Sequence, residues 1–213
     1  GELRKLNSVL APFEELATSQ RAGFAIRGIA SSDLTVFLDV APEVGACVAI
    51  AIERIVALYK QLLEIRKLRA ELKDQGLKDD ALQAINEHAN TLVSTGLDPL
   101  VEDLFERFWH GGDKARQNEL KIELRGSLSS LANRIDVGYN FEVRTAPPAT
   151  AEDSADTTPE DPNITSIRDA AEGMQFLKRE GAPILRLPEP STDEDTAPGG
   201  DEDTHHSPKK KKG

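Results

Sequence analysis

The stretch that decides the fold is EVGACVAIAIERIVALYKQLLEIRKLRAELKDQ, residues 43–75, which follows Pro42. Apolar residues recur in it at steps of three and four, the spacing of one face of an α-helix. The sequence therefore predicts one long amphipathic helix with a coiled-coil-like seam, in which seven of eight core positions are apolar. The eight seam positions are Val48, Ala51, Ile55, Leu58, Leu62, Ile65, Arg69 and Leu72.

The two halves of this helix differ in polarity. Residues 44–52 are the longest apolar run in the chain and predict a segment buried on nearly every side. A membrane-spanning helix needs about twenty such residues, so no transmembrane segment is predicted. Residues 64–73 are heavily charged, and the seam there is expected to pack against the chain's own helices or against a second copy. The candidate residues for self-association are Leu62, Ile65, Arg69 and Leu72.

Further helices are predicted on both sides of the long one. The apolar spacing predicts a helix over residues 2–20, with Pro12 as a point where it can kink or split. Downstream, Gly96 is expected to end one helix and Asp98-Pro99 to start the next, because a capping side chain followed by proline is typical of a helix N-terminus. Residues 111–113 (Gly-Gly-Asp) are expected to break the chain again and to cap another helix.

Two short runs alternate between apolar and polar residues, which is the pattern of a strand. They are residues 33–40 and 139–144. We expect them to pair as a small antiparallel ribbon on the helices, because a lone strand leaves its backbone groups unsatisfied. The predicted fold class is therefore mainly α: a helical bundle around the 43–75 helix, with this two-stranded ribbon.

Charge and proline content divide the chain near residue 146. The net charge of −11 is concentrated towards the end: residues 145–213 carry 15 acidic and 8 basic side chains and nine of the twelve prolines. Such a composition offers little apolar surface to offset the entropy lost on ordering the backbone. We predict a helical domain over 1–146 and an acidic, proline-rich, mostly disordered tail over 147–213.

One part of this tail has the pattern of an ordered segment. A short amphipathic helix is predicted near 164–179, and an apolar stretch between prolines follows it, ending at Pro188. A helix and a strand-like stretch between acidic linkers are typical of a segment that folds on binding. We expect it to dock on a protein partner or on its own domain, for instance as a third strand of the ribbon. The candidate partner-binding residues are Ile164, Ile167, Met174, Leu177, Ile184, Leu185 and Leu187.

Few residues suggest chemistry. Cys47 lies in the most apolar run, without a sign of a thiolate-stabilising cation or solvent access, and is interpreted as a core residue. As the only cysteine it excludes an intramolecular disulfide, which favours a cytoplasmic location. Glu102, Glu106 and His110 would share one helical face, which gives the alternative of a metal-dependent enzyme, although their apolar neighbours push them towards water. We therefore predict no catalytic residue, no cofactor and no metal.

The function predicted is a non-enzymatic protein–protein interaction or scaffold module, whose segment 164–187 docks on a partner or on its own domain. A homo-oligomer through the long helix is a further expectation. The lysine run 209–212 stands beside two acidic triplets, and the folded part is acidic, so no nucleic-acid partner is predicted. A second alternative is a peripheral membrane protein attached through residues 44–52.

Overall fold

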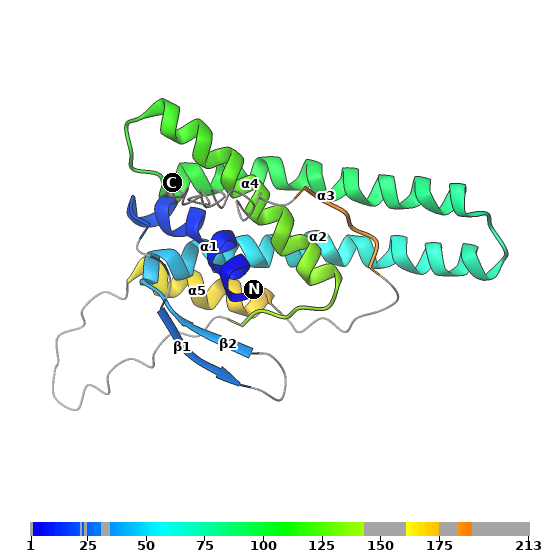
Figure 1. Ribbon diagram of the computed structural model, residues 1–213, viewed down its shortest axis with the longest axis horizontal. Helices are drawn as coiled ribbons and strands as arrows, with labels where there is room; N and C mark the ends of the chain where they lie inside the picture. The colour runs from blue at the N-terminus through cyan, green and yellow to red at the C-terminus, as the bar shows by residue number, and fades with distance from the viewer. Residues whose placement is uncertain are drawn as a thin grey trace, which may run out of the picture.

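The computed structural model describes residues 2–21, 23, 25–30, 35–142, 161–174 and 183–188. This part of the chain is mainly helical, as predicted, and the long helix α2 runs through its centre (Figure 1). Of the tail that was predicted to be mostly disordered, 147–213, residues 147–160, 175–182 and 189–213 lie outside the described residues, and these include 175–179 of the predicted tail helix. The elements within the described residues are α1 (Glu2–Thr18), β1 (Ala25–Ala30), β2 (Thr35–Asp39), α2 (Pro42–Asp74), α3 (Asp79–Phe108), α4 (Lys114–Asp136) and α5 (Pro162–Gly173).

Helix α2 forms almost where the sequence predicts it. It begins at Pro42, whose missing N–H costs nothing in the first helical turn. It ends at a turn in which Gly76 adopts a φ of 81° and the Leu77 N–H donates to the Leu72 carbonyl over 3.0 Å. This turn sends the chain back as α3, so α2 and α3 form a long antiparallel hairpin (Figure 1).

Helix α3 is continuous from Asp79 to Phe108, and the predicted break at Gly96 and Asp98-Pro99 is wrong. A proline inside a helix removes only one backbone hydrogen bond, and packing along the hairpin offsets that loss. Gly96 is explained by close packing: a Cβ at this position would lie 2.6 Å from Cδ2 of Leu58 in α2. Helix α1 is likewise continuous through the buried Pro12.

The predicted pairing of 33–40 with 139–144 is also wrong. Strand β2 pairs instead with β1, antiparallel, and Arg27 is the extra residue of a bulge between two paired positions. Residues 139–142 form no strand, and 143 and 144 lie outside the described residues. Pairing with β1 closes a loop of a few residues, whereas pairing with 139–144 would close one of about a hundred, at a larger entropic cost. The connection 31–34 is therefore enough to make a hairpin.

Helices α1, α4 and α5 cover the N-terminal part of α2, and the shared core lies between them (Figure 1). Helix α4 is capped by Asp113, whose carboxylate accepts from the Ala115 and Arg116 N–H groups, as the Gly-Gly-Asp pattern predicts. Helix α5 runs parallel to α2 in close contact, with Ile167 against Gly45 at one end and Gly173 against Glu53 at the other. The fully buried leucines of α4 are Leu120, Leu124, Leu128 and Leu131.

An ion cluster joins α1 to α4. Both carboxylate oxygens of Glu15 accept from the guanidinium of Arg116, at 2.6 and 2.7 Å. Arg21 bridges Glu15 and Glu123, and Arg116 also pairs with Glu119 at 2.8 Å. The hydrogen bonds from Arg116, followed by those from Arg21, lower the pKa of the largely buried Glu15 below its ordinary value. This cluster therefore stabilises the packing of α1 on α4 while Glu15 is ionised.

Candidate functional site

Residues 183–188 form an extended segment that is held between α3 and the C-terminal end of α4. We call these residues the docked segment; it is the orange trace in Figure 1. The side chains of Ile184, Leu185 and Leu187 are buried in the core, with exposed fractions of 3%, 2% and 7%. Arg186 between them is exposed. The segment therefore contributes three apolar side chains to the fold and turns one cation to water.

The backbone of the docked segment is bound by side chains rather than by another strand. The N–H groups of Ile184 and Leu185 both donate to Oδ2 of Asp136, over 2.6 and 2.9 Å. Each of the four consecutive N–H groups from 184 to 187 thus has a side-chain acceptor, because Arg186 and Leu187 are bound as well. Their acceptors are Oδ1 of Asn90 at 2.8 Å and Oδ1 of Asn133 at 3.1 Å.

Asn133 binds Leu187 twice. Its Oδ1 accepts from the Leu187 N–H, and its Nδ2 donates to the Leu187 carbonyl over 2.9 Å. A carboxamide matches a peptide group in this way because it carries an acceptor and a donor side by side. Asn90 of α3 together with Asn133 and Asp136 of α4 is called the docking site below.

Asp136 is the electrostatic centre of the docking site. It is fully buried, and its Oδ1 lies 3.5 Å from Nη2 of Arg66, which is also buried. The Arg66 guanidinium donates to the Asp136 carbonyl over 3.3 Å and to the Tyr59 hydroxyl. A buried charge is tolerated only when a partner charge and hydrogen bonds replace water. Here Arg66 supplies the charge, and the paired N–H groups of the docked segment supply the hydrogen bonds, as in a backbone anion nest.

This arrangement holds a peptide backbone through side-chain acceptors on α3 and α4. The acceptors read N–H groups, which every residue except proline carries. Apolar surface beneath the segment takes the side chains. The chemistry that the docking site supports is therefore recognition of an extended, apolar chain.

We compared the chain with protein-family models, with curated proteins and with solved structures. No match was found. The chemistry of the docking site is accordingly inferred from its own contacts.

The described partner-binding candidates lie at two places on the chain's own helices, at α5 and in the docked segment. Ile167 in α5 is buried against α2, while Ile164 and Met174 are half-buried. Ile184, Leu185 and Leu187 are the buried residues of the docked segment, and Leu177 lies outside the described residues. The segment lies on helices and forms no third strand of the ribbon.

The predicted self-association residues lie along the α2–α3 hairpin. Leu62 is fully buried, and Ile65, Arg69 and Leu72 are half-buried. Two polar atoms of the hairpin, Nε of Arg69 and Oδ1 of Asn86, are buried without a hydrogen-bond partner. Gly96 of α3 packs against Leu58 of α2, and continuing this antiparallel register along the hairpin brings residue 69 near 85 and 86. The polar residue in the seam thus lies inside the hairpin and faces α3.

The predicted metal candidates lie on the surface. Glu102, Glu106 and His110 are exposed, and Glu102 pairs with Lys121 of α4. Among the described residues, no group of three histidine, cysteine or acidic side chains is placed to hold a metal ion. Cys47 is fully buried, and burial raises the pKa of its thiol.

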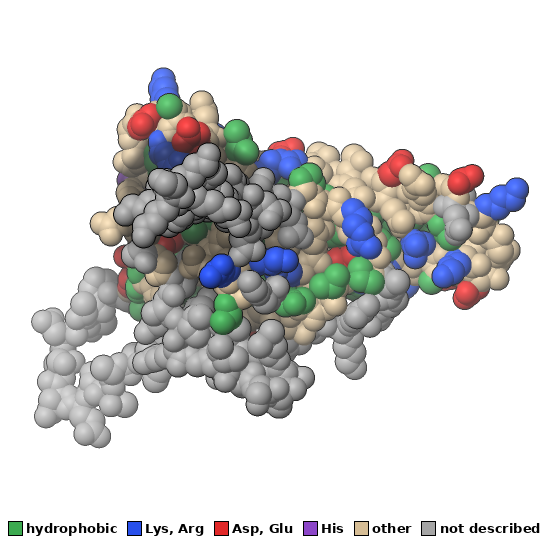
Figure 2. Space-filling view, viewed as in Figure 1, with side chains coloured by type: hydrophobic (Ala, Val, Ile, Leu, Met, Phe, Trp, Pro, Cys, Tyr) green, Lys and Arg blue, Asp and Glu red, His purple; other side chains and the backbone are tan. Residues whose placement is uncertain are grey.

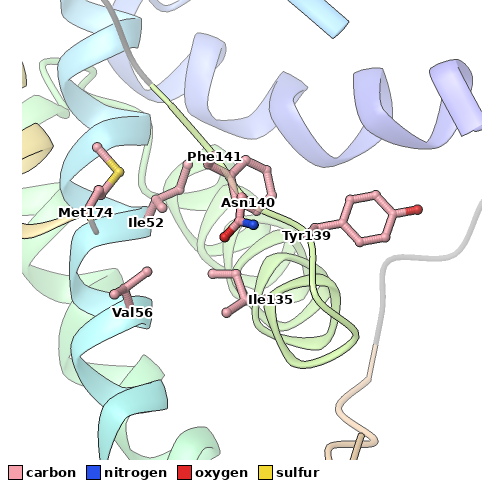
Figure 3. A pocket seen from close by; sticks show the side chains of 7 residues that line it. All are labelled: Ile52, Val56, Ile135, Tyr139, Asn140, Phe141 and Met174. Atoms are coloured by element: carbon pink, nitrogen blue, oxygen red, sulfur yellow. The ribbon is translucent and has the colours of Figure 1, made fainter. Parts of the chain in front are cut away.

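Residues 44–52 are buried or half-buried in the bundle, and no helix in the described ranges combines the length and apolarity needed to cross a bilayer. A small pocket lies where α2, the end of α4 and the end of α5 meet, and Figure 3 shows Tyr139 pointing away from it. Its remaining lining residues are Ile52, Val56, Ile135, Asn140, Phe141 and Met174.

The residues of the docking site were missed in the sequence. Asp136 directly follows Ile135, the last apolar position of α4, and Asn133 is three residues before Asp136, so both resemble ordinary polar residues near a helix end. One local signal for this site was present in the sequence: Arg66 lies next to the apolar seam, between Leu62 and Arg69, where a buried cation needs a partner of opposite charge. Its partner is 70 residues away in the sequence, which no periodicity reveals.

Proposed function

We propose that this chain is a non-enzymatic protein–protein interaction module. The helical body acts as the scaffold, and its docking site holds an extended segment. The chain's own residues 183–188 occupy the site until an extended segment of a partner protein replaces them. The observation that carries this proposal is the hydrogen bonding of four consecutive backbone N–H groups by Asn90, Asn133 and Asp136.

Exchange is supported by the kind of contacts involved. Backbone groups are common to all peptides, so another chain can satisfy the same three acceptors. Helix α5 is fixed separately, through Ile167 and Ala170 in the core, so the docked segment can leave without removing α5. Because the docked segment is tethered to the site, it competes with a partner segment at an effective concentration in the millimolar range. A partner segment must bind tightly enough to displace it at the concentration that the partner reaches.

The proposal is tested by affinity purification with the full chain and two opposing variants. Ile184→Asp with Leu187→Asp weakens the occupant and leaves the docking site intact. Asn90→Ala with Asn133→Ala weakens the docking site and leaves the occupant's side chains intact. Proteins that bind at the site are expected to be recovered more with the first variant and less with the second. Arg186→Ala, an exposed change in the same segment, is the matched control. Recovery that is equal for all four chains would contradict the proposal.

A second proposed interaction is self-association through the part of the α2–α3 hairpin near its turn at Gly76. Leu68 is 50% exposed and Leu77 is 40% exposed there. Basic side chains are spread along this part of the molecule in Figure 2, and acidic ones occur on the same hairpin, so two copies can pair opposite charges. The mass in solution, measured for the full chain and for Leu68→Glu, tests this: a dimer is expected to dissociate in the variant.

The remaining alternatives have their own tests. A metal-dependent enzyme at Glu102, Glu106 and His110 predicts stoichiometric metal in the purified protein. Peripheral membrane attachment through residues 44–52 predicts flotation with liposomes. The cytoplasm is the proposed compartment, on the basis of the single buried cysteine.

A further inference from the structure

The four central positions of the docked segment face different surroundings. Ile184, Leu185 and Leu187 are buried, whereas Arg186 is exposed and its guanidinium donates to the neighbouring Leu185 carbonyl over 2.7 Å. The body therefore surrounds the first, second and fourth side chains with apolar groups. The third side chain extends into water, where its chemical class has little influence on binding.

The backbone contacts impose a second requirement. Asp136, Asn90 and Asn133 together accept from all four N–H groups. A proline at any of these positions would remove one of these donors. The loss is most costly at the first two positions, because the buried, charged Asp136 would keep one N–H in place of two. The segment has its prolines directly outside this run, at Pro183 and Pro188. There they favour an extended chain, because proline fixes its own φ and disfavours helix at the preceding residue.

Charge imposes a third requirement. The first two N–H groups lie against the buried Asp136 carboxylate. An acidic side chain at the first or second position would be buried beside this like charge, which is unfavourable in a medium of low dielectric constant. Aliphatic side chains at these positions add no charge beside the pair that Asp136 forms with Arg66. The docking site therefore rejects acidic segments at the end where Asp136 lies.

We infer that the docking site selects an extended partner segment of the pattern aliphatic–aliphatic–any residue–aliphatic, with a free backbone N–H at all four positions and no acidic residue at the first two. This inference rests on the proposed function and names the class of peptide that the same site takes. The chain's own residues 184–187 are the intramolecular version of this ligand. They reduce the apparent affinity of the whole chain for the partner, which equals the intrinsic affinity multiplied by the fraction of time that the site is free.

The test uses the full chain carrying Ile184→Asp and Leu187→Asp. These changes free the docking site from the docked segment and leave Asn90, Asn133 and Asp136 unchanged. The probe is a fluorescent synthetic peptide with the sequence of residues 181–190, and binding is followed by anisotropy. The open variant is expected to bind the peptide. The wild-type chain is expected to bind it about 100-fold more weakly, because a tethered competitor in the millimolar range opposes a ligand with a dissociation constant of about 10 μM.

Two modified peptides test the pattern. Alanine in place of Arg186 is expected to change the affinity less than threefold. An N-methyl group on the Leu185 nitrogen removes one donor and keeps the side chain, and it is expected to weaken binding about tenfold or more. Far-UV circular dichroism checks that the open variant keeps its helices; if it does not, Leu187→Asp alone is used.

The outcomes separate the two proposals. If a folded open variant binds none of the peptides, the proposed function is overturned. If it binds the parent and the N-methyl peptide equally, or requires Arg186, the pattern is overturned while the interaction site remains. Parent binding with loss on N-methylation and tolerance at Arg186 supports both.

Discussion

Replacing Asn133 by alanine is the most direct perturbation of the docking site. The side chain makes two hydrogen bonds to Leu187, of 2.9 and 3.1 Å, and alanine makes neither. The carboxylate of Asp136 and the amide of Asn90 still hold the other three N–H groups. The variant therefore weakens one end of the docked segment and leaves the rest of the contact in place.

The magnitude follows from these two bonds. A hydrogen bond in a protein contributes about 1 kcal/mol net, so the docking free energy of the segment is expected to fall by about 2 kcal/mol. That corresponds to about a 30-fold increase in the population of the undocked segment. Alanine also has a higher helix propensity than asparagine, by up to about 0.7 kcal/mol, which partly hides the loss in global stability. Asn118→Ala, at an exposed position of the same helix, is the matched control for that gain.

Amide hydrogen exchange measures the effect at the segment itself. In Asn133→Ala, the amides of residues 184–187 are expected to exchange about 30-fold faster than in Asn118→Ala, while amides in the middle of α2 change little. A rise at all four amides means that the segment detaches as a unit, and a rise at Leu187 alone means that only its end frays. Equal exchange of Leu187 in the two variants would refute the argument that Asn133 holds the segment.

Three further changes are expected to have measurable effects. Because the pKa of Glu15 is lower in the folded chain than its value near 4.5 in the unfolded chain, the ionised carboxylate stabilises the fold at pH values above 4.5, and this contribution is lost as the pH falls through the folded pKa. Glu15→Gln is therefore expected to be less stable than wild type in urea unfolding at pH 7, and to lose less stability than wild type on acidification to about pH 3. Arg69→Leu with Asn86→Leu removes two buried unpaired polar atoms and is expected to raise the free energy of unfolding by about 1 kcal/mol; an unchanged or lower urea midpoint would contradict this. A Cβ at Gly111 would lie 2.4 Å from the ring of the single tryptophan, so Gly111→Ala is expected to shift tryptophan emission, whereas Gly112→Ala, with no atom within 4 Å, is expected to leave it unchanged.

Local sequence patterns predicted the helices well because helix formation here depends on side chains three and four residues apart. The prediction of 43–75 differs from the observed α2 by one residue at each end. The tail helix predicted near 164–179 begins close to the predicted position, at Pro162, but ends at Gly173. The same local rules failed at residues 96–99, because Gly96, expected to end a helix, and Pro99, expected to begin one, are both tolerated inside α3 where it packs against α2.

The remaining errors concern contacts between distant residues. Strand β1 has a weak alternating pattern, with a glycine in its middle, and was assigned no structure from the sequence. The docking site depends on partners 48, 54 and 96 residues apart, and each of its side chains is of a type common at helix surfaces. The apolar residues of the docked segment were predicted as a binding element, but which surface binds them is a property of the folded chain.

The α2–α3 hairpin extends beyond the other helices, and the docked segment lies part-way along it rather than at the connecting turn (Figure 1). Its length is therefore independent of the recognition chemistry. Seven residues added to each helix would keep the seam in register and move the connecting turn outward by about 10 Å, at 1.5 Å per residue. The hairpin can thus act as a spacer whose reach changes by whole heptads, so that the distance between a bound partner and anything held at the turn varies in steps while Asn90, Asn133 and Asp136 stay in place.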